Sequence, residues 1–448
     1  MSATTPSPEA NLAAAPAEVQ AETQQAPHPV LATPVRHRSA PLVLGILGII
    51  VASIALVGVG VLFLIWLGPG FTAFAAILAL IPLAVVLLGV RWIDRWEPEP
   101  RFALAFALLW GAGVAVAISL LVDLFVQITL AIGGGEATEA TEALSVAVQA
   151  PVVEEIAKGL GVLLLVWIAR KSFDGPVDGL VYAAVVAAGF AFTENILYFG
   201  RAFGEEAEMG GSVLFTLILR GVLSPFAHPL FTSMTGIGAG IAANSRNAAA
   251  RPFYVLGGYA LAVILHALWN SSASLFDGGT FLLVYGFVMV PLFAAMVTIV
   301  IWQRRREQAV IAEQLPGFAQ AGWIAPSEIQ LLSSLAGRRG WRAAVRQRSG
   351  RAVEQAVVRY QEAVTDLAFL RDRIAKGAIG PMARQWHDEA VAEVIRTRRK
   401  AVGHPEALTV ALRHHGGGAG GWIPPPPVPA SPRQPFPPGL PPQSWPHR

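Results

Sequence analysis

Seven polar side chains that are suited to hydrolytic chemistry lie inside otherwise apolar stretches of this 448-residue sequence. They are Glu154, Glu155, Lys158, Glu194, His228, His266 and Asn270. Carboxylates can act as general bases, imidazoles can bind a metal ion, and amides can donate hydrogen bonds to an oxyanion. An unpaired charge in lipid costs about 2.5–3.5 kcal/mol, so we expect these groups to face one another or water.

The composition predicts that the chain is an all-α polytopic membrane protein. It is 54% hydrophobic and 14% charged, with a mean hydropathy of +0.52, whereas soluble domains carry about 25% charged residues. No ionisable side chain occurs in residues 41–90, and about 20 apolar residues suffice to cross a bilayer. The chain has no cysteine, which excludes disulfides, a thiolate nucleophile and a cysteine-ligated metal. The net charge of +3 gives no indication of nucleic-acid binding.

The sequence divides into four expected parts. Residues 1–40 are rich in Ala, Pro, Thr and Gln and are expected to be disordered. Residues 41–302 form the membrane domain, and residues 303–405 are polar, Arg-rich and patterned as a small cytoplasmic helical region. Residues 406–448 form a Gly- and Pro-rich tail of polyproline character, also expected to be disordered.

The membrane domain is expected to contain eight transmembrane helices. Their approximate limits are 41–66, 71–91, 102–131, 146–169, 179–199, 213–243, 253–276 and 281–302. Arginines and lysines flank every second connection, and the alternate connections are short or acidic, such as "EATEATEA". By the positive-inside rule, both termini are then cytoplasmic and the chain is a multi-pass protein of the cell membrane.

The positions of the polar residues along these helices predict that they converge. At 1.5 Å per residue, Glu154 lies roughly 12 Å and Glu194 roughly 8 Å from the outer surface. Asn270 and His266 lie roughly 9 and 15 Å from it. Glu154 and Lys158 are four residues apart, as are His266 and Asn270, so each pair shares one helix face.

His228 fits this depth only if its span begins late. If Arg220 extends to the outer headgroups, His228 comes to roughly 12 Å from that surface. Pro225 and Pro229 flank His228 and are expected to kink the span and open space beside it. The sequence therefore predicts one shared site in the outer half of the membrane.

Four motifs in these spans resemble those of the PrsW family of intramembrane proteases. They are "EEIAK" at 154–158, "FAFTEN" at 190–195, the lone His228, and "HALWN" at 266–270. Each motif alone is weak, but their order on consecutive spans is specific. The resemblance covers roughly residues 70–300. It also extends to the wider superfamily of CAAX prenyl endopeptidases and bacteriocin-immunity proteins, in which a histidine often stands at the position of Glu194.

Peptide hydrolysis requires an activated water molecule and stabilisation of an oxyanion. We assign the base to Glu154, with Glu155 and Lys158 orienting it and balancing its charge, although the two glutamates could exchange roles. Asn270 is assigned to the oxyanion.

A metal ion is the second element of this interpretation. The side chains of Glu194, His228 and His266 suit Zn²⁺, with a fourth position left for water. A metal-independent glutamate mechanism, in which the histidines only hold water, is the alternative.

The expected substrate is a membrane-anchored protein, and the resemblance implies an anti-sigma factor or another single-span signalling protein. The alternative function is a proton-coupled transporter or channel, because buried Glu and His side chains also form proton relays. Transporters often contain internal repeats, and none is found between spans one to four and five to eight. Confinement of the site residues to spans four to seven favours a catalytic site.

The C-terminal region carries two amphipathic, Arg-rich helix candidates, at 341–374 and 384–400. Their basic face could bind anionic lipid or simply be solvated. The Pro-rich tail could bind a partner's groove or nothing at all.

Overall fold

The computed structural model describes residues 40–96, 98–133, 138–169, 173, 175–209, 212–274, 278–377, 379 and 382–402. Both tails that the sequence analysis expects to be disordered lie outside these residues, except that Ala40 begins the first helix. Within the described residues every regular element is a helix, which confirms the all-α fold class.

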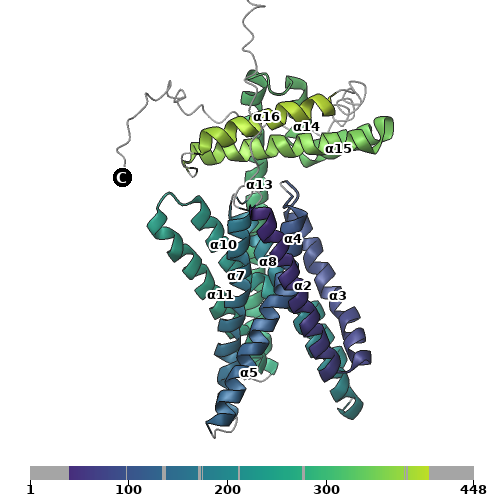
Figure 1. The fold of residues 1–448 in the computed structure, drawn as a ribbon, viewed down its shortest axis with the longest axis vertical. Coiled ribbons are helices and arrows are strands. Elements are labelled where there is room, and N and C mark those ends of the chain that lie inside the picture. Colours follow the sequence, from purple (N-terminus) through teal and green to yellow (C-terminus); the bar gives the residue numbers. More distant parts are fainter. Residues whose placement is uncertain are drawn as a thin grey trace, which may run out of the picture. The chain divides into compact units, whose positions relative to one another are not determined.

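Helices occur at all eight expected spans (Figure 1). The first two spans are α2 (Ala40–Trp66) and α3 (Pro69–Ile93). The third comprises α4 (Arg101–Leu109), the π-helical turn η2 (Trp110–Ala115) and α5 (Val116–Ile132). The fourth comprises α6 (Glu139–Leu144), the π-helical turn η3 (Ser145–Gln149) and α7 (Ala150–Ile168), and the fifth is α8 (Pro176–Met209).

Two of the last three spans, the sixth and the eighth, also contain a π-helical turn. The sixth comprises α9 (Ser212–Leu217), the π-helical turn η4 (Ile218–Leu223) and α10 (Ala227–Asn244). A 3₁₀ turn, η5 (Ala248–Ala250), leads to α11 (Arg251–Ser274). The eighth comprises α12 (Gly278–Val284), the π-helical turn η6 (Tyr285–Met289) and the start of α13 (Val290–Gln320).

Seven of these spans are long and apolar enough to cross a membrane by length and composition. The fourth span falls outside that set, and its helix α7 carries Glu154, Glu155 and Lys158. Helix α7 instead packs against α5, α8, α10 and α11. The three charged residues of α7 are thus buried against the neighbouring helices.

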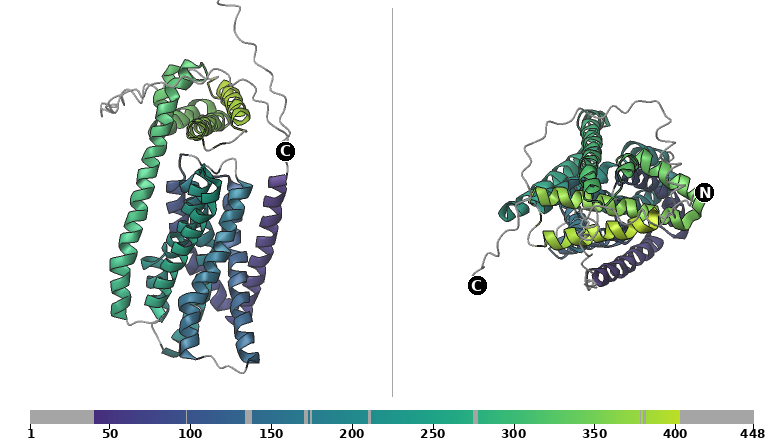
Figure 2. Two further views of the ribbon diagram at one scale, coloured as in Figure 1. Left: turned by 90° about the vertical axis from the view of Figure 1, so that its left-hand side faces the viewer. Right: turned by 90° about the horizontal axis from the view of Figure 1, so that it is seen from above.

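Helix α8 forms the centre of the bundle. In α8, 72% of the membrane-spanning window is buried, compared with 17% in α2 and 11% in the α12–α13 span. It packs against α3, α4, α7 and α10 (Figures 1 and 2). Close approach of α8 and α10 depends on two facing glycines, because a Cβ on Gly236 would lie 2.1 Å from the carbonyl oxygen of Gly179.

The sixth span is interrupted in its middle, as Pro225 predicts. Helical structure stops after Leu223 and resumes at Ala227. The Tyr285 hydroxyl donates to the carbonyl oxygen of Leu223 at 2.9 Å, and the Ser224 hydroxyl donates to that of Leu219 at 2.6 Å. The bond from Tyr285 satisfies a carbonyl group that a continuous helix would have bonded internally, whereas the Leu219 carbonyl also accepts from the Ser224 backbone N–H at 3.0 Å.

Helix α13 continues without a break past residue 302, the expected end of the membrane domain, to Gln320 (Figure 2). The arginines at 304–306 stand where the chain is expected to pass from lipid to water, but charged side chains do not end a helix. The chain then forms η7 (Pro326–Glu328), α14 (Ile329–Leu332), α15 (Leu335–Ala375) and α16 (Ala383–Ala401). Helix α15 is kinked at Gly350, where φ is 81°.

The C-terminal helices share an apolar core of their own. It includes Ile311 and Phe318 of α13 together with Trp341 and Tyr360 of α15. Trp96, from the turn that follows α3, is 4% exposed and belongs to the same core. A residue of the membrane bundle is therefore part of the C-terminal core.

The Gly179–Gly236 contact predicts that Gly236→Ala destabilises the bundle. The added Cβ forces α8 and α10 apart, so the free energy of unfolding should fall by about 1–3 kcal/mol. Denaturant unfolding in detergent micelles, followed by tryptophan fluorescence, measures this change. Gly257→Ala in α11 is the matched control, because its Cβ meets nothing within 4 Å. Equal losses in the two variants would contradict the prediction.

Candidate active site

Four neighbouring helices bring the predicted site residues together. Glu154, Glu155 and Lys158 come from α7, Glu194 from α8, His228 from α10, and His266 from α11. The side chains of Glu155 and Lys158 are fully buried, and His266 is 1% exposed. Convergence of these spans, which the sequence analysis predicts from depth and helix face, is present in the structure.

Lys158 lies at the centre of this cluster. Its Nζ is 2.7 Å from Oε1 of Glu155 and 3.4 Å from Oε2 of Glu154. It also lies 4.3 Å from the ring centroid of Phe190, as a cation–π contact. One ammonium thus balances two adjacent carboxylates in a buried site.

The two glutamates differ in how many partners they have. Oε1 of Glu155 contacts Lys158 and also lies 3.0 Å from Nδ1 of His266, while Oε2 accepts a hydrogen bond of 2.9 Å from the Thr232 hydroxyl. Oε2 of Glu154 has only Lys158 and, at 3.7 Å, Nε2 of His266. Both oxygens of Glu155 are therefore occupied, whereas Glu154 keeps the capacity to bind a further group.

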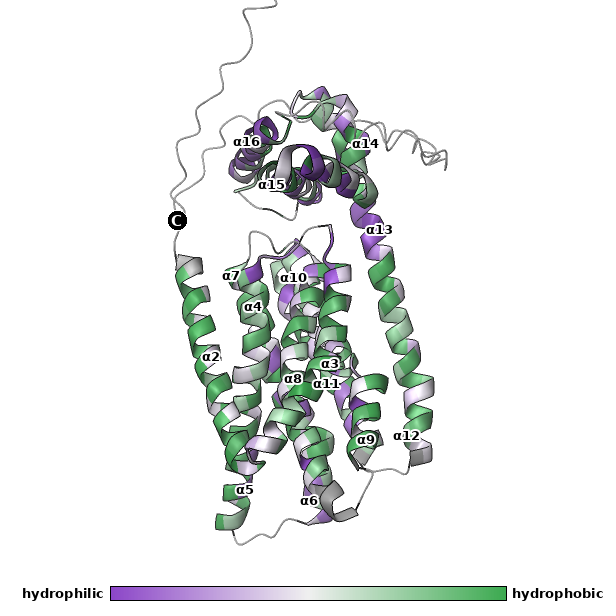
Figure 3. Ribbon diagram, turned by 90° about the vertical axis from the view of Figure 1, so that its right-hand side faces the viewer, coloured by the Kyte–Doolittle hydropathy of each residue, from purple (hydrophilic) through white to green (hydrophobic). Residues whose placement is uncertain are grey.

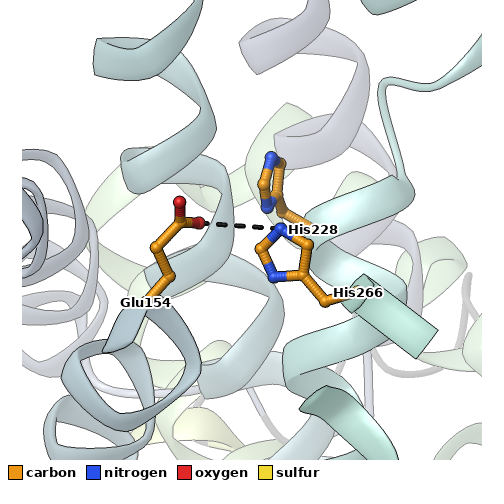
Figure 4. Close-up of side chains that lie close together, drawn as sticks. All are labelled: Glu154, His228 and His266. Atoms are coloured by element: carbon orange, nitrogen blue, oxygen red, sulfur yellow. Dashed lines mark ion pairs between the residues drawn. The ribbon is translucent and has the colours of Figure 1, made fainter. Parts of the chain in front are cut away.

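Glu154, His228 and His266 form the group that could hold a metal ion (Figure 4). One ligand atom from each lies within 4.8 Å of the other two, and all three residues are buried. The two imidazole rings meet edge to face, with centroids 5.0 Å apart. The bond from Nδ1 of His266 to Glu155 leaves Nε2 free to face Glu154, which is the usual arrangement of a metal-binding histidine.

Glu194, which the sequence analysis places in the metal set, has other partners. It forms an ion pair with Arg220 and lies 2.9 Å from Nε2 of His228. It therefore adjoins the cluster through His228, while Glu154 lies with both histidines.

Arg220 is a site residue that the sequence analysis did not identify. The expectation that it extends to the headgroups was wrong. Its Nε donates to Oδ1 of Asn195 at 2.8 Å, its guanidinium lies 3.8 Å from the Tyr198 ring centroid, and it pairs with Glu194. The available signal was Glu194 itself, because a carboxylate inside a span requires a counter-charge.

A cavity of about 210 Å³ opens beside the cluster. Polar lining side chains come from His228, Arg220, Asn195 and Asn270. Asn270 lies at this cavity and donates a 3.2 Å hydrogen bond to the carbonyl oxygen of Val146. It therefore borders the space next to the histidines, but its amide already has one partner in the described chain.

The sequence matches the profile of the PrsW family intramembrane metalloproteases over residues 99–296. It is 32% identical over 198 residues to Protease PrsW of Geobacillus kaustophilus (strain HTA426), covering 44% of this chain and 79% of that protein. The chain belongs to the PrsW family of intramembrane proteases. Protease PrsW of Clostridioides difficile (strain 630) is 29% identical over 194 residues, covering 43% of this chain and 76% of that protein. No solved structure matches the chain significantly.

Membership of the PrsW family confirms the resemblance that the four motifs indicate. The matched region contains every site residue described above, and it leaves α2, α3 and the C-terminal helices outside. A protease is therefore favoured over the transporter alternative.

The ion cluster predicts that Lys158→Met lowers the free energy of unfolding by about 3–5 kcal/mol, because it leaves two carboxylates buried without their cation. Denaturant unfolding in detergent micelles measures the loss. Adding Glu155→Gln to Lys158→Met should restore part of the stability, since it removes the closest unpaired charge. Wild-type stability in the single variant would show that the cluster does not depend on this cation.

Proposed function

We propose that this protein hydrolyses a peptide bond in a membrane-anchored protein, with Glu154 activating the attacking water molecule. The observation that carries the proposal is the buried group of Glu154, His228 and His266 beside a cavity of about 210 Å³. A water molecule between these three side chains would contact a carboxylate and two imidazoles. General-base catalysis of this kind contributes about 10²–10⁴-fold to a rate.

The unequal partners of the two glutamates support a division of roles. Glu155 has both oxygens occupied by Lys158, His266 and Thr232, so we assign it to positioning His266. Glu154 has the free acceptor capacity that a base requires. Lys158 balances the charge of both carboxylates. Asn270, at the edge of the cavity, is the proposed donor to the oxyanion.

We further propose that Oε2 of Glu154, with His228 and His266, holds Zn²⁺, so that Oε1 of Glu154 is left to take the proton of the water molecule. Arg220 orients Glu194 towards His228. One carboxylate and two imidazoles are a donor set that zinc accepts, and the family is described as metalloproteases. When bound, the ion would lower the pKa of its water molecule and polarise the substrate carbonyl.

The position of Lys158 favours a second form of the mechanism, without metal. Its Nζ lies 3.3 Å from Nδ1 of His228 and 3.4 Å from Oε2 of Glu154, so a positive charge already occupies one side of the group. A second cation there would be repelled. In this form Glu154 takes the proton of the water molecule directly.

We infer the substrate class from the family resemblance and the topology from the distribution of charged residues. The substrate is a single-span membrane protein, and the family resemblance points to an anti-sigma factor. From the distribution of arginines we infer a protein of the cell membrane with both termini in the cytoplasm and the acidic 136–142 connection outside. Any partner of the Pro-rich tail would bind residues 406–448, which lie outside the described chain.

Comparison of protein termini in cell membranes tests the protease assignment. Membranes from cells making the wild-type protein should contain new termini from a single-span protein. Glu154→Gln at matched expression should reduce their formation by about 10²–10⁴-fold, because the base is lost. Glu142→Gln, the same change at an exposed position of α6, should leave cleavage unchanged.

The same experiment tests the topology, since the soluble fragment should be released outside the cytoplasm. Release into the cytoplasm would reverse the proposed orientation. Identical termini in wild-type and Glu154→Gln membranes would refute the protease proposal. Loss of solute flux in the variant would then favour the transporter.

Metal analysis of purified protein separates the two forms of the mechanism. We expect about one equivalent of Zn²⁺, which His266→Ala should greatly reduce because a ligand is lost. Glu154→Gln should also weaken binding, whereas Glu194→Gln should retain most of it, which distinguishes the two candidate carboxylates. Full activity after complete removal of metal by a chelator would establish the metal-independent form.

A further inference from the structure

A second cavity, of about 160 Å³, lies between α3, α8, α10 and α13. Its lining is apolar apart from the hydroxyl of Ser233 and the indole nitrogen of Trp92. Helix α13 closes it on one side with Phe293, Val297 and Val300. The catalytic groups are not part of it, and the protease assignment does not account for it.

This apolar cavity adjoins the cavity of about 210 Å³ beside the ion cluster, which is called the catalytic cavity below. Val86 of α3 lines both, and Phe226 of the apolar cavity stands between Pro225 and Ala227 of the catalytic one. The break in the sixth span is therefore the partition between the two spaces. An apolar chain lying in the first would have one end next to His228.

Helix α13 covers the apolar cavity with few contacts. Only 11% of the α12–α13 window is buried, and both Phe293 and Val297 remain more than a third exposed, at 38% and 36%. Figure 3 shows α13 to one side of the helices that carry the site, as does the left view of Figure 2.

Among the described residues, three contacts of aromatic rings and one hydrogen bond join the membrane part of α13 and η6 to the bundle. Phe293 meets Phe226 with ring centroids 5.2 Å apart, and the Arg304 guanidinium lies 4.2 Å from the Trp92 ring centroid. Tyr285 of η6 lies beside Trp269 of α11, with ring centroids 6.3 Å apart, and its hydroxyl donates to the carbonyl oxygen of Leu223. None of these four contacts is an ion pair.

We propose that the transmembrane segment of the substrate reaches the site laterally, between α3 and α13. This inference rests on the proposed function. The occupant is a protein span because the apolar space adjoins a cavity lined by His228 and Asn270, two of the groups assigned to peptide hydrolysis. An α-helix is about 10 Å across, so the present volume admits side chains only, and α13 must move outward to admit a helix.

This route determines which part of the substrate is cut. The apolar cavity lies towards the ends of α3 and α8 marked by Ile93 and Leu180, and the catalytic cavity towards the opposite ends, at Val146 and Tyr198. A span lying in the apolar cavity therefore presents its α6-side end to the catalytic cavity, at His228. Cleavage falls near that end and not in the middle of the span.

Tethering α13 to α3 tests the route, and the absence of native cysteines makes the tether specific. Trp92→Cys and Arg304→Cys are combined and bridged with a short bis-maleimide. Two substrates are compared, namely the single-span protein identified by its termini and a soluble peptide covering its cut site. Bridging should slow cleavage of the full-length protein by about tenfold or more and leave the peptide unaffected, because only the span needs α13 to move.

The controls separate this inference from the proposed function. The unbridged double variant should cleave both substrates as the wild type does. Equal cleavage of the full-length protein before and after bridging would overturn the lateral route and leave the protease intact. Failure of the wild-type protein to cleave either substrate would overturn both.

Disulfide trapping tests the same surface without tethering. In the inactive Glu154→Gln background, Val297→Cys should trap the substrate through a cysteine placed in its span. Phe287→Cys, on the same span but 78% exposed and outside the cavity lining, should trap at least about tenfold less. Equal trapping at both positions, or only a disulfide-linked dimer of the enzyme at Val297, would overturn the proposal.

Discussion

The contact between Lys158 and the two carboxylates beside it is the constraint on which the bundle depends. Removing each ion from water costs several kcal/mol, and only good geometry with further hydrogen bonds offsets that cost. The further bonds come from Thr232 on α10 and His266 on α11. Helix α7, the span outside the seven that are long and apolar enough to cross a membrane, is thus held in the bundle by the helices that complete its ion cluster.

The interruption of the sixth span brings Arg220 and His228 together at Glu194. In a continuous helix, Arg220 and His228 would be separated by about 12 Å along the axis. With the π-helical turn and the break at 224–226, both contact the same oxygen of Glu194. Irregular backbone is tolerated at membrane depth where it lines a cavity, and Pro225 and Ala227 do line one.

Hydropathy and charge predicted the eight helices and the four that carry the site, because apolar length and buried charge are local properties of a sequence. The pairing of side chains could not be predicted in the same way. Whether Glu154 or Glu194 lies with both histidines depends on the rotation of α7 and α8 about their axes. That rotation is determined by close packing at positions such as Gly236, which hydropathy does not reveal.

The role of Arg220 was mispredicted and the continuation of α13 past residue 302 was not predicted, for related reasons. A cation eight residues before His228 could extend to the headgroups or turn inward, and only the position of Glu194 decides between the two. The arginines at 304–306 mark where the solvent changes, but the helix continues to Gln320 because no glycine or proline interrupts it at that point.

Burial of Trp96 in the C-terminal core has a consequence for biosynthesis. Trp96 is translated more than 200 residues before Trp341 and Tyr360 of the same core, and before Arg338, whose guanidinium lies 5.0 Å from its ring centroid. During synthesis, its indole therefore lacks these partners until α15 has left the ribosome. The C-terminal helices in turn cannot complete their core until α3 is in place. Assembly of the C-terminal core therefore depends on prior insertion of α3.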